Sequence, residues 1–278
     1  DMYGGSLHNR MRLLIEIVRD IKKKCGPDFP VGVKLSTEDW EPEGIRIDET
    51  VEVAKALERE GCSHINVMGG THATAALEFL KPNCFNAEDC KKIADAVNIP
   101  VFVGHNIFTP EEAENLLENN CGEFVALGRS QLADPHWTIK AETGKTDEIT
   151  PCINCLIGCL DRGLLNHTAI HCTVNPGLYK FEKETVNTTD PRSVAVVGAG
   201  PAGCEAALTA ANNGHKVTLY EKREFGGAMI KGAKPENKKN IRRLISYYKD
   251  HIEKHPNITF IKETSISLQG RPRKQSLT

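Results

Sequence analysis

The chain has 278 residues, of which 40% are hydrophobic and 26% are charged, and its formal net charge is -2. Roughly two domains fit this length, and the hydrophobic share is sufficient for a buried core. Without a long run of one charge sign, nucleic acid and anionic membranes are not expected as partners, and no apolar stretch reaches the ~18 residues of a membrane span. Composition therefore predicts a soluble, cytoplasmic protein.

The first 150 residues alternate between helical and strand-like patterns. Apolar residues from Leu7 to Ile21 recur at spacings of three and four, which predicts an amphipathic helix that ends at Cys25-Gly26-Pro27. Strands are then predicted at 31–35, 64–68, 100–103 and 124–127, with helices at 48–60, at 88–97 and from Thr109 onward. This alternation predicts parallel strands with helical crossovers, either in a doubly wound sheet or in a (β/α)8 barrel.

Glycines follow the last two of these strands, in Gly104-His105-Asn106 and in Gly128-Arg129. A barrel commonly holds phosphate in the loops after its last two strands. Exposed backbone amides and one guanidinium suit a phosphate dianion, because arginine offers a rigid fork of donors. Spacing alone is equally compatible with a phosphate site and with tight turns followed by a surface arginine. A complete barrel takes about 250 residues, so the units present amount to only part of one.

Four of the ten cysteines lie in one short segment. Cys152, Cys155 and Cys159 form a C-x2-C-x3-C pattern, and Cys172 follows further along. Three close thiolates plus a distant fourth are typical of a [4Fe-4S] cluster. Structural zinc is the competing interpretation, although zinc sites usually present two C-x2-C-like pairs, and redox disulfides are a third. The scattered cysteines are expected to be small buried hydrophobes.

A second domain is predicted after a polar linker at 185–192. A strand at 193–197 enters Gly198-Ala199-Gly200-Pro201-Ala202-Gly203, a helix is expected at 205–213, and a strand at 216–220 ends in Glu221. The glycines permit a tight turn and close approach of the backbone, the helix N-terminus faces a pyrophosphate, and the acid binds a ribose hydroxyl. This pattern predicts a dinucleotide site without distinguishing FAD from NAD.

The chain resembles the old yellow enzyme family, in particular its multidomain iron–sulfur branch, which includes 2,4-dienoyl-CoA reductase, 2-enoate reductase and trimethylamine dehydrogenase. Residues 1 to about 140 resemble the second half of that family's flavin barrel. The matching stretches are Asp1-Met2-Tyr3-Gly4-Gly5-Ser6 with Asn9-Arg10, Val33-Lys34-Leu35-Ser36, Gly69-Gly70-Thr71-His72, and Ala126-Leu127-Gly128-Arg129 with Leu132-Ala133-Asp134-Pro135. The glycine fingerprint with Glu221-Lys222 and Gly226-Gly227 resembles the FAD-binding half of the same branch's disulfide-reductase-like module.

The resemblance implies an α/β architecture in consecutive parts. These are the C-terminal half of a (β/α)8 FMN barrel at 1–145, a [4Fe-4S] segment at 146–184, the linker at 185–192 and the start of a Rossmann-like FAD domain at 193–278. The implied FMN contacts are Lys34, Gly104, Asn106, Gly128 and Arg129, and the implied FAD contacts are Gly198, Gly200, Gly203, Glu221 and Gly227. The cluster ligands would be Cys152, Cys155, Cys159 and Cys172, and His72 would be catalytic.

The implied function is an NAD(P)H-dependent oxidoreductase that reduces an activated C=C bond in an unsaturated carbonyl compound of the enoate or enoyl-CoA type. Electrons would pass from FAD through the cluster to FMN. Two alternatives stay open: an amine dehydrogenase of the same architecture, and a non-catalytic fragment whose cysteines bind zinc. The first barrel half, with a tyrosine acid, and the remainder of the second domain are expected to be missing, so the isolated fragment is expected to be inactive.

Overall fold

The protein folds as two compact units, Asp1–Thr173 and Val174–Thr278. The architecture is taken from a computed structural model that describes residues 2–71, 74, 77, 80–178 and 188–263. The division falls inside the segment expected to hold the cysteines, and the boundaries expected from sequence stay predictions. Among the described residues, no helix has the length and apolar character that a membrane crossing requires.

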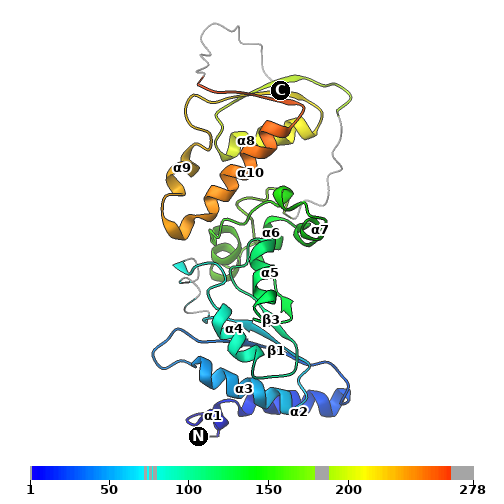
Figure 1. The fold of residues 1–278 in the computed structure, drawn as a ribbon, viewed down its shortest axis with the longest axis vertical. Coiled ribbons are helices and arrows are strands. Elements are labelled where there is room, and N and C mark those ends of the chain that lie inside the picture. The colour runs from blue at the N-terminus through cyan, green and yellow to red at the C-terminus, as the bar shows by residue number, and fades with distance from the viewer. Residues whose placement is uncertain (1, 72–73, 75–76, 78–79, 179–187, 264–278) are drawn as a thin grey trace. The chain divides into compact units, whose positions relative to one another are not determined.

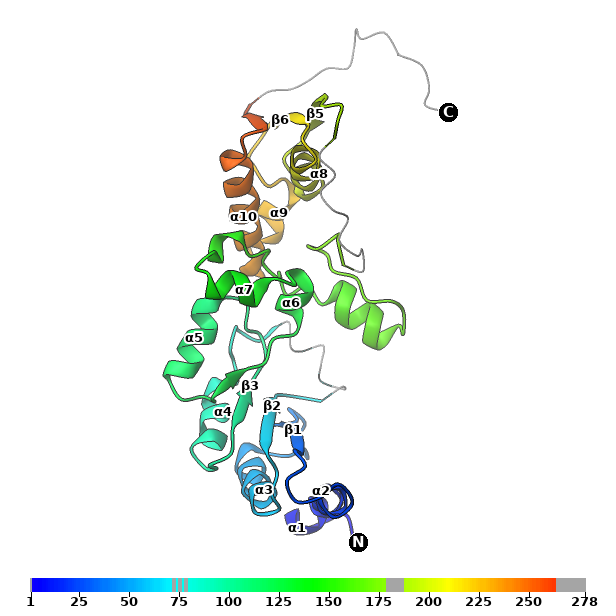
Figure 2. The ribbon, with the colours of Figure 1, turned by 90° about the vertical axis from the view of Figure 1, so that its right-hand side faces the viewer.

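The first unit contains a parallel four-stranded sheet in the order β1-β2-β3-β4, of which β1, β2 and β3 are labelled in Figure 2. The strands are β1 (Gly32–Ser36), β2 (His64–Met68), β3 (Val101–Val103) and β4 (Phe124–Val125). On β2 and β3 the alternate residues Ile65, Val67, Val101 and Val103 are buried in one core beneath the crossover helices. The carboxyl ends of all four strands therefore meet at one edge of the sheet.

Helices connect these strands as the alternating pattern predicts. They are α1 (Leu7–Arg10), α2 (Arg12–Cys25), α3 (Ile47–Arg59), α4 (Ala87–Ala94), α5 (Pro110–Glu118), α6 (Arg129–Ala133) and α7 (Trp137–Glu142). Helix α5 begins with a capping box, in which the Thr109 side chain accepts a hydrogen bond from Glu112 N while the Glu112 carboxylate accepts one from Thr109 N. Short helical segments η2 (Thr146–Glu148) and η3 (Ile157–Leu165) follow.

Two expected elements differ from the structure. The single helix predicted over Leu7 to Ile21 is divided at Met11, where α1 ends with φ -82° and ψ -9° and α2 begins. The strand predicted at 124–127 is shorter, since β4 ends at Val125 and the chain turns into α6 at Gly128. Ala126 N still donates to Val103 O at 2.8 Å, so the loop leaves the sheet gradually.

The second unit contains a parallel three-stranded sheet in the order β5-β6-β7. The strands are β5 (Ser193–Val197), β6 (Lys216–Tyr220) and β7 (Ile258–Ile261), and the helical segments are α8 (Pro201–Asn212), α9 (Ala228–Gly232), η4 (Glu236–Lys238) and α10 (Asn240–Lys254). Helices α8 and α10 lie side by side (Figure 1). Helix α8 begins at Pro201, earlier than expected, because proline is compatible with the first helical position.

Candidate functional site

A cleft of about 380 Å³ opens at the carboxyl ends of β1 to β4. It is lined by all five residues of the first unit that the resemblance places at FMN, namely Lys34, Gly104, Asn106, Gly128 and Arg129. A Cβ added to Gly128 would meet no atom within 4 Å, so the backbone there faces open space. The structure thus brings these residues together in one cleft, while their contacts with a flavin stay a prediction.

Lys34 and His105 are two titratable residues that line the cleft. Lys34 is exposed on β1, and within the described part of the chain its side-chain ammonium has no hydrogen bond or ion pair. Burial, assisted by the charges of Arg129 and Lys34, lowers the pKa of His105 to about 4. Its imidazole is therefore neutral near pH 7, and its buried Nδ1 has no hydrogen-bond partner among the described residues.

His105 was not among the site residues predicted from the sequence. Its position directly after Gly104, at the end of a strand, was the only available indication of a role. The backbone is left-handed at His105, with φ 80°, and its ring contacts Phe85 with centroids 5.4 Å apart. These features of the loop fix the imidazole in the wall of the cleft.

Arg129 connects three loops around the cleft. Its Nη2 donates to Asn106 Oδ1 at 2.7 Å, and its Nη1 donates to Asn154 Oδ1. The neighbouring Ser130 Oγ donates to Ile107 O at 2.6 Å, which further joins the loop after β3 to the start of α6. The guanidinium therefore touches both Gly104-His105-Asn106, hereafter the phosphate loop, and the cysteine-bearing segment 151–173, hereafter the cysteine loop.

The four clustered cysteines all belong to the first unit, and none of them forms a disulfide within the described part of the chain. His171 N donates to Gly158 O at 2.8 Å, and this bond brings the backbone before Cys172 against the start of η3, which contains Cys159. Cys155 Sγ lies 3.2 Å from Thr173 Oγ1. Among the described residues, no three His, Cys, Asp or Glu side chains are grouped as they would be around one metal ion.

Burial dominates the acidity of two of these thiols. It raises the pKa of Cys152 to about 12 and also raises that of Cys159. The positive charge of Arg129 opposes the rise at both sites. Metal binding requires thiolates, so any metal or cluster bound here would release protons on binding.

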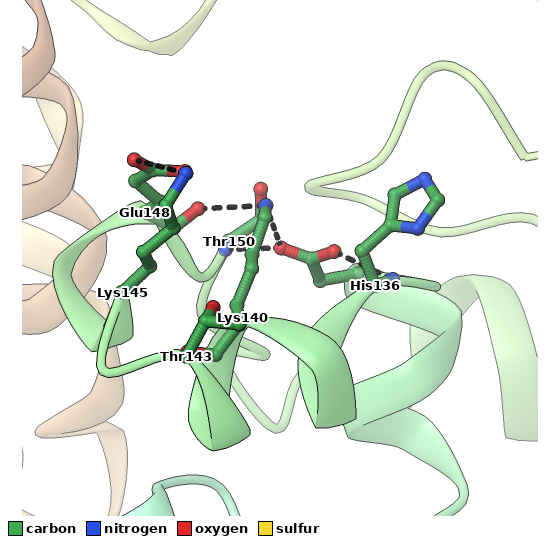
Figure 3. A network of polar contacts seen from close by, with 7 residues as sticks. His136, Lys140, Thr143, Lys145, Glu148 and Thr150 are labelled. Atoms are coloured by element: carbon green, nitrogen blue, oxygen red, sulfur yellow. Dashed lines mark hydrogen bonds and ion pairs between the residues drawn. The ribbon is translucent and has the colours of Figure 1, made fainter.

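Asp134 anchors the chain where it enters the cysteine loop, and its hydrogen-bond partners His136, Lys140 and Thr150 are labelled in Figure 3. Its side chain is only 3% exposed and accepts hydrogen bonds from Lys140 Nζ at 2.6 Å, Thr150 N at 2.9 Å and His136 N at 3.0 Å. Lys140 Nζ also donates to Glu148 O at 2.9 Å. The network holds Thr150, which immediately precedes the Pro151-Cys152 step.

The glycine loop of the second unit has the tight geometry that its fingerprint predicts. A Cβ added to Gly203 would lie 1.8 Å from Gly198 O, so no larger residue fits. Gly198 has φ 101°, a conformation that favours glycine. A Cβ at Gly227, which has φ 56°, would lie 3.1 Å from Gly200 Cα, so the two glycine-containing loops approach closely.

Glu221 lies at the end of β6 beside this loop. Its carboxylate accepts hydrogen bonds from Ala199 N and Arg223 N, each at 2.7 Å. Burial opposes the charge of Glu221, but hydrogen bonds from backbone N–H groups outweigh it and lower its pKa. A carboxylate offers about four acceptor positions, so these two bonds leave capacity for a ribose hydroxyl.

His72, the predicted catalytic residue, lies outside the described residues.

Comparison with known proteins identifies relatives of both units. Residues 1–148 match the model of the NADH:flavin oxidoreductase / NADH oxidase family, and residues 192–274 match that of pyridine nucleotide-disulphide oxidoreductases. An NADH oxidase of Thermoanaerobacter brockii is 38% identical over 91% of the chain, and a cinnamate reductase of Clostridium sporogenes is 33% identical over 89%. The solved 2-naphthoyl-CoA reductase complex is 29% identical over 96% of the chain, with a TM-score of 0.87.

The chain spans only part of these proteins. It covers 39% of the NADH oxidase, 40% of the cinnamate reductase and 41% of the 2-naphthoyl-CoA reductase chain. The two family matches nevertheless confirm the fold class, which combines part of a flavin barrel with a Rossmann-like domain.

Proposed function

The chain belongs to the NADH:flavin oxidoreductase / NADH oxidase family, and on this premise we propose that the protein reduces an activated C=C bond of an enoate or enoyl thioester at the expense of NAD(P)H. A cinnamate reductase and a 2-naphthoyl-CoA reductase among its relatives support this substrate class. The observation that carries the proposal is the cleft of the first unit, which brings Lys34 and Arg129 together with the loops that contain Gly104 and Gly128.

These cleft residues fit FMN. FMN supplies hydride transfer when bound. The open space at Gly128 leaves room for a phosphate, and Arg129 would hold it with the backbone of Gly104 and Asn106. The ammonium of Lys34 would stabilise negative charge at the pyrimidine edge of the ring. A cation without an internal partner in the described part of the chain suits this role.

The cysteine loop fits a [4Fe-4S] cluster. Such a cluster transfers single electrons when bound. Cys152, Cys155, Cys159 and Cys172 would be its ligands, and the hydrogen bond between His171 and Gly158 holds their two segments together. A cubane has four separate corners, so its thiolates need not converge on one point as they do around zinc. None of the four cysteines is in a disulfide within the described residues, so all four sulfur atoms could become cluster ligands.

The second unit fits FAD, the cofactor through which NAD(P)H would enter. Gly198, Gly200 and Gly203 would admit the pyrophosphate at the N-terminus of α8, and Gly227 lies against the same loop. The carboxylate of Glu221 would accept a hydrogen bond from the ribose. These residues would orient FAD, whereas the redox chemistry is that of FAD itself.

Cofactor analysis of the full-length protein, purified without oxygen, tests the proposal. We expect FMN, FAD and about four irons with equivalent sulfide per chain. NAD(P)H should bleach the flavins, and a cinnamate-type enoate should reoxidise them. Flavin reduction by a methylamine in the absence of NAD(P)H would instead establish an amine dehydrogenase, and stoichiometric zinc without flavin would establish a non-catalytic scaffold.

Variants assign the cofactor and catalytic roles separately. Cys155→Ser should lose iron while still being able to bind FMN, whereas Cys25→Ser should keep the iron and FMN content of the wild type, because Cys25 is an exposed thiol far along the chain from the cluster segment. His72→Gln should lower turnover with an enoate while NAD(P)H still bleaches the flavins. Iron retention by Cys155→Ser would contradict the ligand assignment, and full turnover by His72→Gln would contradict the catalytic one.

A further inference from the structure

Two buried asparagines hold the same guanidinium from opposite loops. Asn106 is 2% exposed and Asn154 is 7% exposed, and each presents its Oδ1 to Arg129. Both have left-handed backbones, with φ 52° at Asn106 and φ 53° at Asn154. Asparagine tolerates this conformation better than most residues, but it persists only where the surroundings favour it. The three side chains therefore form a defined bridge.

One end of the bridge is fixed independently of Arg129. Asn106 Nδ2 lies 3.4 Å from Lys81 O and 3.3 Å from Pro82 O, and Asn106 O accepts a hydrogen bond from Cys84 N at 3.1 Å. These contacts define which side of the amide faces the guanidinium. The loop after β3 therefore offers Arg129 a rigid acceptor.

The other end of the bridge belongs to the cysteine loop. Asn154 lies between Cys152 and Cys155, so a change in its backbone moves both cysteines. Its side chain reaches Arg129 across 25 positions of sequence. An arrangement of the loop that favours one position of Asn154 therefore also favours one position of the guanidinium.

We propose that Asn154 is a positioning residue that links cluster binding at the cysteines to FMN binding in the cleft. When the cysteine loop is held in its ligating arrangement, Asn154 keeps Arg129 oriented toward the phosphate loop, and FMN need not order that long side chain on binding. Linkage is reciprocal, so bound FMN must strengthen cluster binding by the same factor. This inference rests on the proposed function, because it requires both cofactors.

The wild-type protein provides the first test. FMN binding to the full-length, flavin-free protein is titrated by quenching of FMN fluorescence, before and after reconstitution with iron and sulfide. We expect tighter FMN binding after reconstitution, by about 5-fold or more, as is typical of linked sites. Iron retained at equilibrium with a chelator should rise correspondingly when FMN is present. Neither measurement depends on turnover.

Three variants assign the linkage to Asn154. Asn154→Gly permits the left-handed backbone but removes the acceptor, so it should reduce the difference in FMN affinity to less than about 2-fold, well below typical coupling. Asn154→Asp keeps an acceptor and should retain the difference. Asn166→Ala is the matched control, because Asn166 is exposed and its amide binds Asp161 instead.

The possible failures are distinguishable. A wild-type protein that takes up no iron would overturn both the proposed cluster and the linkage. Iron uptake with unchanged FMN affinity would overturn the linkage alone, whatever the variants do. If the wild type shows the difference and Asn154→Gly retains it, or if Asn154→Asp loses it, the assignment to Asn154 is wrong.

Discussion

Replacing Asp134 with asparagine should loosen the chain at the entrance to the cysteine loop. Asp134 is buried and binds Lys140 and Thr150 through Oδ2 and His136 through Oδ1. An asparagine can present its oxygen to only one of these sides, and its NH2 group then faces a donor on the other. The variant therefore loses at least one hydrogen bond and the negative charge opposite Lys140.

The magnitude follows from the contacts that are lost. A charge-assisted hydrogen bond contributes about 1.5–3 kcal/mol and a neutral one about 1 kcal/mol, so we expect local stability to fall by roughly 3 kcal/mol. Lys140 is 23% exposed and keeps its bond to Glu148 O, which holds the loss below that of a fully buried pair. In hydrogen exchange, this corresponds to amide opening on the order of 100-fold more frequent.

Exchange of the amides of His136 and Thr150, followed by mass spectrometry on the full-length protein, measures this effect directly. Peptides from the second unit serve as an internal control and should be unchanged. Lys140→Met is the matched variant, because it leaves the Asp134 carboxylate with both backbone donors and should cost less. If Asp134→Asn changed exchange at Thr150 by less than about 2-fold, a difference of about 0.4 kcal/mol, the reasoning would be refuted.

Three further changes test the remaining site residues. Gly203→Ala should abolish FAD binding, measured as FAD content, because its Cβ would lie 1.8 Å from Gly198 O. Lys34→Met should lower the midpoint potential of bound FMN in spectroelectrochemistry, since a cation no longer stabilises the reduced ring. In flavin-free protein, NMR should show His105 titrating at about 4, and Lys34→Met should raise that pKa. Because histidine in the unfolded chain protonates near pH 6.5, the free energy of unfolding should fall as the pH drops from there toward 4. His105→Asn should weaken this pH dependence, as measured by urea unfolding at several pH values.

Several elements were predictable because their determinants are local. The strands expected at 64–68, 193–197 and 216–220 coincide with β2, β5 and β6, since each is a short apolar or β-branched run bounded by turn-forming or polar residues. The start of α5 was equally clear from its capping residues. Each of these patterns is complete within a few neighbouring residues.

Other elements were not predicted, because their apolar patterns do not show where the element begins or ends. Helix α10 buries Leu244, Tyr248 and Ile252 on one face, but charged residues precede Leu244 and follow Tyr248, and neither α10 nor β7 was expected. The break at Met11 interrupts an apolar stripe that continues on both sides. Tertiary packing, rather than local preference, decides where such segments begin and end.

The sequence by itself determined which chemistry-bearing residues are present and how they are spaced. The glycine fingerprint, Glu221 and the four clustered cysteines could be recognised because short-range spacing limits what a turn or a helix start can present. Their family was recognisable from the same letters, and the matches over 1–148 and 192–274 confirm it.

Only the tertiary structure decided how these residues meet. Arg129 reaches Asn154 across 25 positions and Asn106 across 23, and Asp134 reaches Thr150 across 16. The burial that keeps His105 neutral likewise depends on loops from separate strands. Side-chain periodicity describes only the faces of individual elements, so contacts between distant loops arise when the parallel sheet places its strand ends together.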